Sequence, residues 1–285
     1  MSIEVRNLRY VYSPGMPGET TALDGVSFEV RDGEMLGVIG HTGSGKSTLL
    51  QHLNGLLKPE SGEVYVDGQC LTDGSAKLSE IRRKVGLVFQ YPEYQLFEET
   101  VAKDVAFGPR NIGLEEDQID LRVKTAIDLV GLDYDEICDV SPFDLSGGQK
   151  RRVAIAGVIA MQPSVLILDE PTAGLDPDAH REILSMIKYI HEKMGIIIVF
   201  VSHNMADVAE MSDRIIVMDH GRIALEGTPR EVYSHEEELA AMGLGIPPAR
   251  EIMSIVKEAI PEISGDVLTA DEAAEILRDY ISKRK

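Results

Sequence analysis

One glycine-rich stretch constrains the fold of this 285-residue chain more than any other feature. It fits the pattern G-x-x-x-x-G-K-[ST] through Gly40, His41, Thr42, Gly43, Ser44, Gly45, Lys46, Ser47 and Thr48. The apolar run 35–39 before it predicts a buried strand, and the run 48–54 after it predicts a helix. In a strand–loop–helix unit, glycines let backbone N–H groups face a phosphate, and the helix start adds partial positive charge. The stretch therefore predicts an α/β chain that binds a nucleoside triphosphate.

Two carboxylates follow a second apolar run, residues 165–168. Asp169 and Glu170 would lie at the carboxyl edge of a sheet, where α/β folds place ligand groups. We expect Lys46 to reach the β- and γ-phosphates, and Ser47 and Asp169 to bind Mg²⁺. Glu170 would polarise the attacking water. The alternative is an acidic pair that only caps the next element, and the phosphate loop outweighs it.

Composition narrows the class of protein. The formal net charge of −20 argues against nucleic acid as a partner, because phosphate binding draws on surplus Lys and Arg. Cys70 and Cys138 lie in unrelated contexts, which predicts reduced thiols. Residues 1–6 lead directly into an alternating strand pattern, so no secretion signal is expected. The longest apolar runs, 153–161 and 196–201, are too short for a membrane span.

Strand and helix patterns divide the chain into regions. Strands are expected at 3–12, 26–30, 63–66, 85–89, 196–201, 214–218 and 222–225, and a helix at 180–194. Residues 91–160 read as a mostly helical insertion, with a helix over 117–130 and proline-bearing loops around Pro109 and Pro142. Beyond residue 244 a separate helical tail begins, in which Thr269 and Glu272 predict a capping box.

A second candidate phosphate site lies within the helical insertion. A Ser-Gly-Gly turn opens the helical run 149–160 and presents N–H groups at a helix start. Its residues are Ser146, Gly147, Gly148 and Gln149. One chain thus carries two such loops, about a hundred residues apart, and only the first has the lysine and the metal-binding hydroxyl.

The motifs together resemble the nucleotide-binding subunits of ABC transporters, from the first strand to about Tyr233. By this resemblance Tyr12 stacks on adenine, although Tyr10 is close enough to leave the choice open. Gln90 resembles the Q-loop glutamine that touches Mg²⁺ or water, and His203 the switch histidine at the γ-phosphate. Residues 174–176 resemble the D-loop, with Asp176 at the nucleotide.

The resemblance implies the architecture as well. It predicts an α/β, RecA-like P-loop NTPase core with an antiparallel β subdomain and a helical signature subdomain at about 91–160. The ATPase domain would span 1–244, and a short helical extension 245–285. Two such domains would pair head to tail, so that ATP lies between residues 40–48 of one subunit and 146–149 of the other.

Residues 89–97, 100–101 and 104–109 narrow the resemblance to the energy-coupling factor (ECF) importers. Residues 40–43 and 51–57 look most like the second ATPase of the heterodimeric module. This implies an ATPase at the cytoplasmic face of the membrane that powers uptake of vitamins or transition-metal ions. Its partners would be a second ATPase subunit, a transmembrane coupling protein and a substrate-binding membrane component.

The tail carries an amphipathic pattern with two interpretations. Ile252, Ile255, Val256 and Ala259 would share one helical face, and a later helix carries an apolar stripe: Ala273, Ile276, Leu277, Tyr280 and Ile281. The resemblance implies that this extension helps to hold two ATPase subunits together. Packing of the stripe on the chain's own core is the equal alternative.

Other functions fit less well. An ATPase of another ABC importer class is the nearest alternative. Soluble ABC ATPases of DNA repair or chromosome structure carry coiled coils or zinc modules between the two loops, and this interval has neither. A translation factor needs two cassettes, and a GTPase needs an NKxD motif. A non-hydrolysing binder would lack Glu170 or His203. The transported compound, and whether the partner ATPase is a copy or a relative, stay open.

Overall fold

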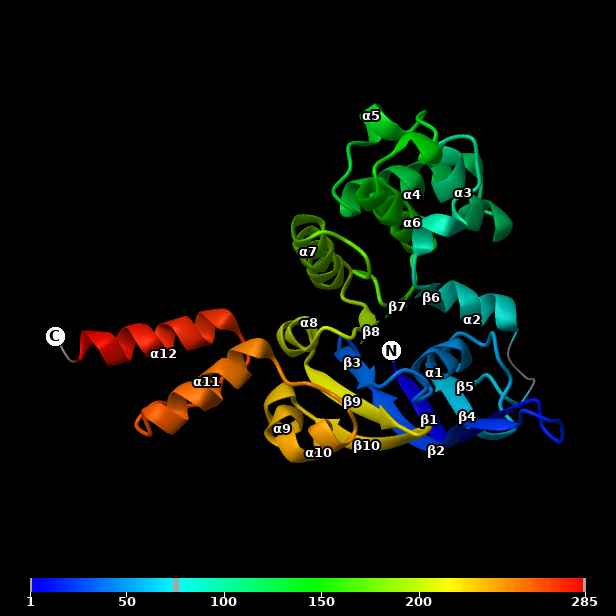
Figure 1. Cartoon of the computed structure of the whole chain (residues 1–285). Coiled ribbons are helices and arrows are strands. Elements are labelled where there is room, and N and C mark those ends of the chain that lie inside the picture. The colour runs from blue at the N-terminus through cyan, green and yellow to red at the C-terminus, as the bar shows by residue number, and fades with distance from the viewer. Residues whose placement is uncertain (1, 74–76, 284–285) are drawn as a thin grey trace.

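The computed structural model describes residues 2–73 and 77–283 (Figure 1). Within these residues a six-stranded sheet runs in the order β10–β9–β3–β8–β7–β6. Its strands are β3 (Met35–Gly40), β6 (Val85–Val88), β7 (Val165–Asp169), β8 (Ile197–Val201), β9 (Arg214–Asp219) and β10 (Arg222–Gly227). The pairs are parallel except β9 with β10, which form the antiparallel hairpin that the sequence predicts.

A smaller antiparallel sheet lies beside the first. It contains, in the described residues, β2 (Thr20–Val30), β1 (Ile3–Tyr12), β4 (Ser61–Val66) and β5 (Gln69–Cys70), in that order. β2 begins six residues earlier than the pattern 26–30 predicts. Its first part pairs with the end of β1, Tyr12 opposite Thr20, so cross-strand pairing extends the strand to the exposed Thr20 and Thr21.

The central strands are buried on both faces. Every residue of β3 and β8 is buried. Met35 and Ile39 belong to one core cluster, whereas Leu36 and Val38 belong to the other. Helices therefore cover one face and the antiparallel sheet with α1 the other. Burial of both faces explains why these strands read as unbroken apolar runs.

Residues 91–160 are mostly helical and lie at the top of Figure 1. Its elements are η1 (Pro92–Gln95), α3 (Val101–Asn111), α4 (Glu116–Leu129), α5 (Tyr134–Ile137), η2 (Pro142–Asp144) and α6 (Gly147–Ile159). The predicted loop around Pro109 is wrong, because Pro109 lies inside the last turn of α3. A proline there removes a single helical hydrogen bond. Val105 and Ala106 share a core cluster with α6, and this packing keeps the turn helical.

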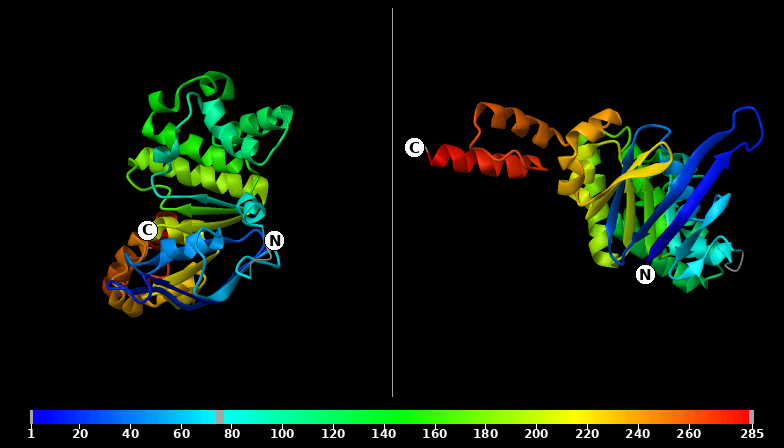
Figure 2. Two further views of the ribbon diagram at one scale, coloured as in Figure 1. Left: turned by 90° about the vertical axis from the view of Figure 1, so that its right-hand side faces the viewer. Right: turned by 90° about the horizontal axis from the view of Figure 1, so that it is seen from below.

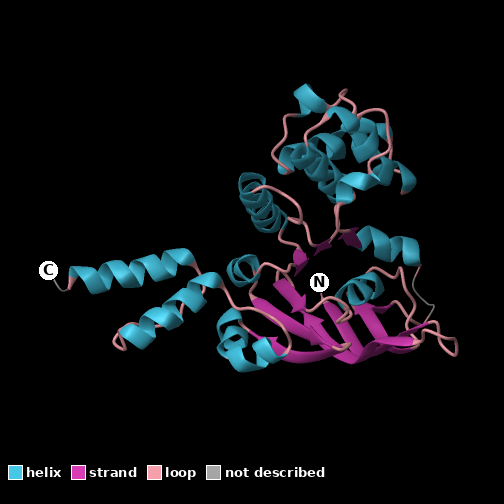
Figure 3. Cartoon of the chain, in the orientation of Figure 1, coloured by secondary structure: helices cyan, strands magenta, loops and turns pink. Residues whose placement is uncertain are grey.

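The other helices flank the sheets, as Figure 3 shows. They are α1 (Lys46–Leu53), α2 (Leu78–Lys84), α7 (Pro177–Met194), α8 (Met205–Met211), α9 (Pro229–Ser234) and α10 (Glu236–Ala241). α7 begins three residues before its predicted start, because Asp176 caps it and Pro177 occupies its first position. None of the helices in the described ranges is long and apolar enough to cross a membrane.

The tail forms a helical hairpin of α11 (Pro248–Ala259) and α12 (Ala270–Ser282), which projects from the body in Figures 1 and 2. The predicted capping box of α12 is half formed. Thr269 Oγ1 accepts from the Glu272 N–H at 3.3 Å. The Glu272 carboxylate accepts instead from the Leu268 N–H at 2.8 Å and from Arg230 at 2.7 Å, so it ties the hairpin to α9.

The apolar face predicted for α11 is divided between two environments. Val256 packs with the buried Met253 in a small cluster inside the hairpin. Ile252 and Ile255 are 58% and 64% exposed, as is Ile281 of α12 at 57%. Part of the stripe thus packs internally, and part of it faces outward. The last two residues of the predicted extension, Arg284 and Lys285, lie outside the described residues.

Candidate nucleotide-binding site

The chemistry-bearing side chains meet at the carboxyl ends of β3, β7 and β8. Because these strands are parallel neighbours, the segments that follow them lie at one edge of the sheet. They enclose a pocket of about 520 Å³. It is lined by Tyr12, Thr20, Ala22, Thr42, Gly43, Gly45, Lys46, Ser47, Thr48, Gln90, Asp169, Glu170 and His203.

Backbone geometry explains the glycines of the loop at 40–48. Gly45, the N-cap of α1, has φ of +104°, a conformation that L side chains rarely adopt. A Cβ atom there would lie 2.4 Å from the Ala22 carbonyl oxygen. At Gly40 it would lie 2.3 Å from the Met218 carbonyl oxygen. The loop is therefore held close to β2 and β9 by contacts that a side chain at either glycine would block.

Lys46 is the first residue of α1, directly after Gly45, and its side chain is buried. Its Nζ donates to the carbonyls of Gly40 at 2.6 Å and His41 at 3.0 Å. Burial lowers the pKa of the ammonium, and the charges of Glu170 and Asp169 oppose that shift. The cation is thus positioned by the loop and faced by two carboxylates.

Ser47 and Asp169 are joined although 122 residues separate them in the chain. Ser47 Oγ donates to Asp169 Oδ2 at 2.9 Å. Burial raises the pKa of Asp169, while the bond from Ser47 and the charge of Lys46 hold it down. The pair offers a hydroxyl and a carboxylate oxygen beside Gln90, which is also on the pocket wall.

Glu170 follows Asp169 in the chain and is buried, with a backbone conformation that is rare for this residue type. Its φ is +52°, a left-handed conformation that costs energy in a non-glycine residue and is enriched at functional sites. Burial raises the pKa of Glu170 from 4.5 to about 7; the charges of Asp169 and Asp207 add to the rise, and a hydrogen bond from the His203 backbone opposes it. His203 Nε2 lies 3.2 Å from Glu170 Oε1, without hydrogen-bond geometry. Burial lowers the pKa of His203, which favours a neutral ring.

Two tyrosines compete for the adenine role, and the structure places them differently. The Tyr12 side chain lines the pocket, is 41% exposed, and its hydroxyl lies 3.2 Å from Thr48 Oγ1. Tyr10 packs edge-on against His52, with ring centroids 4.8 Å apart, and is absent from the pocket wall. Position alone therefore favours Tyr12.

The signature residues do not join this pocket. Residues 146–149 line a separate depression with Gly174, Leu175 and Asp176. Ser146 Oγ accepts from the Gln149 N–H at 3.3 Å, and Gln149 Oε1 accepts from the Ser146 N–H at 3.0 Å, a complete capping box on α6. Asp176 caps α7, and the N–H groups of Ala179 and Asp178 lower its pKa. The predicted nucleotide ligands thus fall on two surfaces of one chain.

Sequence reasoning missed several residues of the site. Thr20 and Ala22 line the pocket only because β2 pairs with β1, which no local pattern reveals. Arg151, 1% exposed, donates to Glu93 at 2.7 Å and to the carbonyls of Pro171 and Ala173 at 3.0 and 2.8 Å. It joins the segment after Gln90, the signature helix and the loop after Glu170. An arginine after a glycine turn gives no sequence signal for such burial.

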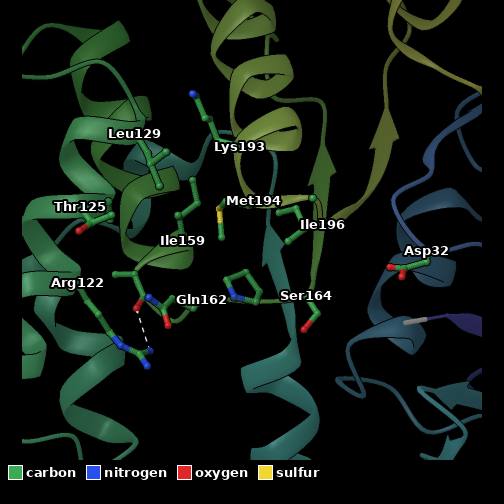
Figure 4. Close-up of a pocket in the computed structure, with 14 residues that line it drawn as sticks. Asp32, Arg122, Thr125, Leu129, Ile159, Gln162, Ser164, Lys193, Met194 and Ile196 are labelled. Atoms are coloured by element: carbon green, nitrogen blue, oxygen red, sulfur yellow. Dashed lines mark hydrogen bonds between the residues drawn. The ribbon is translucent and has the colours of Figure 1, made fainter.

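A further pocket of about 570 Å³ lies at the opposite edge of the sheet, before β7 and β8 (Figure 4). Ile159, Met194 and Ile196 line it, with Arg122 and Lys193 at its margin. Arg122 donates to the carbonyl of Met161 at 3.3 Å. This pocket lacks the glycine loop and the paired carboxylates, so the candidate nucleotide site is the one at the carboxyl edge.

Comparisons with known proteins agree with this geometry. The family model described as ABC transporter matches residues 23–173. The energy-coupling factor transporter ATP-binding protein EcfA2 of Clostridioides difficile (strain 630) is 57% identical, covering 98% of this chain and 97% of that protein. EcfA2 of Clostridium perfringens (strain 13 / Type A) is 53% identical, covering 99% of each. These matches confirm the predicted resemblance to energy-coupling factor ATPases.

Solved structures confirm the predicted fold class. The structure of cbiO1 from Clostridium perfringens, described as part of the ABC transporter complex cbiONQ, has a TM-score of 0.76 and 38% identity, covering 92% of this chain and 96% of that one. The cassette MJ0796, a dimer bound to ADP and phosphate in a post-hydrolysis state, has a TM-score of 0.70 and 30% identity, covering 79% and 98%. The chain therefore belongs to the ABC transporter family, as an ATP-binding and ATP-hydrolysing subunit of the energy-coupling factor type.

Proposed function

We propose that this chain hydrolyses ATP in a site that a second ATPase subunit completes, and thereby powers an energy-coupling factor importer. The main support for this proposal is that the predicted ligands of one ATP lie on two separate surfaces of the chain. Lys46, Ser47, Asp169, Glu170 and His203 share one pocket, whereas residues 146–149 and Asp176 line another depression. A head-to-tail pair would bring each depression over the other subunit's pocket. The dimeric state of the related cassette MJ0796 supports such pairing.

The pocket's own residues account for nucleotide binding. The N–H groups of the loop at 40–48 and the Lys46 ammonium would hold the phosphates, and Tyr12 would stack on adenine. Ser47, Asp169 and Gln90 supply hydroxyl, carboxylate and amide oxygens, the hard ligands that suit Mg²⁺. When bound there, Mg²⁺ would neutralise charge on the phosphate oxygens.

Glu170 is the proposed general base for the attack of water on the γ-phosphate. A base works best when its pKa lies near the working pH, and burial brings the pKa of Glu170 to about 7. The water oxygen would bond to the γ-phosphorus while the water transfers a proton to the Glu170 carboxylate. The bond between the γ-phosphorus and the oxygen that bridges to the β-phosphate would break in the same step. Neutral His203 would donate to a γ-phosphate oxygen, and Ser146 of the partner subunit would add a further donor.

A cluster of exposed aromatic side chains supports a docking role for the helical region. Tyr94 is 85% exposed, Phe97 56% and Phe107 46%, all within the chain segment that follows Gln90. Phe97 and Phe107 pack edge-on, with ring centroids 4.9 Å apart. We propose that this surface receives the transmembrane coupling protein at the cytoplasmic face of the membrane. Because Gln90 lines the nucleotide pocket, a movement of this segment on docking would shift Gln90 within that pocket.

The other partners follow from the extension and from the family. The exposed Ile252, Ile255 and Ile281 would contact the partner ATPase, as a copy or a relative of this chain. A separate membrane component would select the cargo, a vitamin or a transition-metal ion. The similarity to EcfA2 proteins supports the second position of a heterodimeric module.

Purification from membranes tests the proposal. The tagged chain, expressed in its native background and extracted in mild detergent, should bring down a second ATPase and two integral membrane proteins. A matched variant with Tyr94 and Phe97 changed to Ser should keep the ATPase partner and lose the membrane proteins. Recovery of the chain alone, with active ATPase and no membrane protein, would contradict the transport role.

A further inference from the structure

A cluster of metal-ligating side chains stands beside the phosphate loop and takes no part in the proposed hydrolysis. It consists of His41, next to Gly40 in the loop, Asp219 at the end of β9, and His220 in the turn that leads to β10. We propose that His41, Asp219 and His220 bind a divalent transition-metal ion of the Zn²⁺, Co²⁺ or Ni²⁺ class. Binding of such an ion would not depend on the transport role.

The spacing of the three groups suits one ion. His41 Nε2 lies 3.1 Å from Asp219 Oδ1, and His220 Nε2 lies 3.8 Å from the same oxygen. One ligand atom from each residue falls within 4.8 Å of the others. Two ligands held at 2.0–2.2 Å from one ion stand about 3.0–3.5 Å apart at ordinary coordination angles. The first pair already meets this spacing, and the 85% exposed His220 side chain has room to close the second.

The hydrogen bonds of His41 point to a cation at its other nitrogen. His41 Nδ1 lies 2.9 Å from the Thr42 carbonyl oxygen, which can only accept, so Nδ1 carries a proton. A neutral ring would then turn the lone pair of Nε2 toward the Asp219 carboxylate at 3.1 Å, and two acceptors repel. A proton or a metal ion between them removes the repulsion. Metal-binding histidines commonly show this arrangement, with the second ring nitrogen donating to a backbone carbonyl.

The ligand chemistry selects the class of ion. Two imidazoles and one carboxylate suit Zn²⁺, Co²⁺ and Ni²⁺, whereas Mg²⁺ and Ca²⁺ prefer oxygen ligands alone. The proposed site therefore differs in selectivity from the Ser47–Asp169 pair of the nucleotide pocket. Millimolar Mg²⁺ should not compete for it.

The site is connected to the loop that holds Lys46. The Gly221 N–H donates to the Ser44 carbonyl at 3.0 Å, and the His41 carbonyl accepts from Lys46 Nζ at 3.0 Å. An ion shared by His41, Asp219 and His220 would fasten the β9–β10 turn to the start of the loop. Backbone amide exchange in residues 41–46 should then slow when the ion binds.

Titration with Co²⁺ tests the site directly. The full chain, free of nucleotide and in millimolar Mg²⁺, should bind one equivalent, with visible absorption that Zn²⁺ abolishes. His220→Ala and Asp219→Asn should each weaken binding by at least about tenfold, as expected for loss of a ligand. His235→Ala is the matched control, because His235 is an exposed histidine 2.9 Å from Glu238 outside the cluster.

Two further readouts separate binding from misfolding. His220 is outside the nucleotide pocket, so His220→Ala should bind a fluorescent ATP analogue as the unmodified chain does. Slower amide exchange with Co²⁺ should appear in residues 41–46 of the unmodified chain and be lost in His220→Ala. The proposal is overturned by the absence of saturable binding, by equal binding in His220→Ala, or by displacement with Mg²⁺. Any of these outcomes would leave His41, Asp219 and His220 as a side-chain cluster without a metal-binding role.

Discussion

The nucleotide pocket and the signature surface both present backbone N–H groups at the start of a helix, but only one is built for chemistry. The pocket's helix α1 has Gly45 at its N-cap and no capping side chain. Behind it, burial shifts the pKa values of Lys46, Asp169 and Glu170. At the signature, Ser146 and Gln149 cap each other, and Asp176 is exposed with its pKa lowered.

This contrast separates two tasks. Burial of an ionisable group costs folding free energy unless a partner charge or a ligand compensates for it. Groups with shifted pKa values therefore tend to cluster at functional sites, as they do in this pocket. The capping box pairs the N–H groups of Ser146 and Gln149 within α6, so the start of this helix is stabilised without a ligand. Changes in the pocket should therefore alter ATP binding by the isolated chain, whereas changes at the signature should alter ATP turnover only in the assembled enzyme.

The largest effect is expected from Glu170→Gln. Loss of the base should lower ATP turnover of the assembled transporter by roughly 10²- to 10⁴-fold, the usual contribution of general-base catalysis. ATP binding should persist and trap a closed ATPase pair, measured by sedimentation with ATP. Glu237→Gln, an exposed glutamate on α10, is the control and should turn over normally. Normal turnover in Glu170→Gln would remove Glu170 from the catalytic role.

Lys46→Ala should weaken ATP binding by the isolated chain by roughly a hundredfold or more. The variant loses charge-assisted hydrogen bonds to phosphate, each worth about 1.5–3 kcal/mol. Isothermal titration with ATP measures the change. Lys103→Ala removes an exposed lysine paired with Glu99 and should leave the affinity unchanged. Tight ATP binding by Lys46→Ala would contradict the role assigned to the loop.

Ser146→Ala tests the other side of the contrast. Turnover of the assembled transporter should fall roughly ten- to a hundredfold, the value of one hydrogen bond to a charged group. ATP affinity of the isolated chain should stay unchanged. Ser141→Ala is matched, because Ser141 caps η2 as Ser146 caps α6, and each change costs about 1 kcal/mol of helix capping. Equal losses in both variants would reduce Ser146 to a structural cap.

The pH dependence of turnover should follow Glu170. Its pKa of about 7 means that the carboxylate needed as base forms as pH rises, so turnover should increase about tenfold between pH 6 and 8.

The stability of the folded chain should change with pH in the opposite direction to turnover. The folded chain binds a proton that the unfolded chain releases near pH 4.5, so unfolding free energy should fall by up to about 3 kcal/mol as pH rises from 4.5 to 7. Thermal melts of Glu170→Gln should lack this component, and a melt profile identical to the unmodified chain would contradict it.

Much of the fold and part of the site follow from local patterns. The buried strands before Gly40 and Asp169 read directly as apolar runs, and parallel neighbours had to bring their ends together. The sequence could not reveal Arg151, because its burial depends on three carbonyl and carboxylate partners from distant segments. The loop predicted around Pro109 is wrong for the same reason. Packing of α3 against α6 outweighs the tendency of proline to end a helix. Local chemistry predicts the ligands, and tertiary contacts decide how they are supported.

The smallest effect is expected at the adenine end of the pocket. Tyr12→Ala should weaken ATP binding by roughly two- to tenfold, the range of one aromatic stacking interaction of about 0.5–1.5 kcal/mol. Tyr12→Phe keeps the ring and loses only the contact with Thr48, so its affinity should stay within about twofold. Tyr10→Ala instead removes a ring packed on His52 and should lower the melting temperature more than the affinity. A larger loss of affinity in Tyr10→Ala than in Tyr12→Ala, at equal stability, would reassign adenine to Tyr10. Because both tyrosines belong to the chain that carries Lys46, neither change should alter how a partner's Ser146 affects turnover.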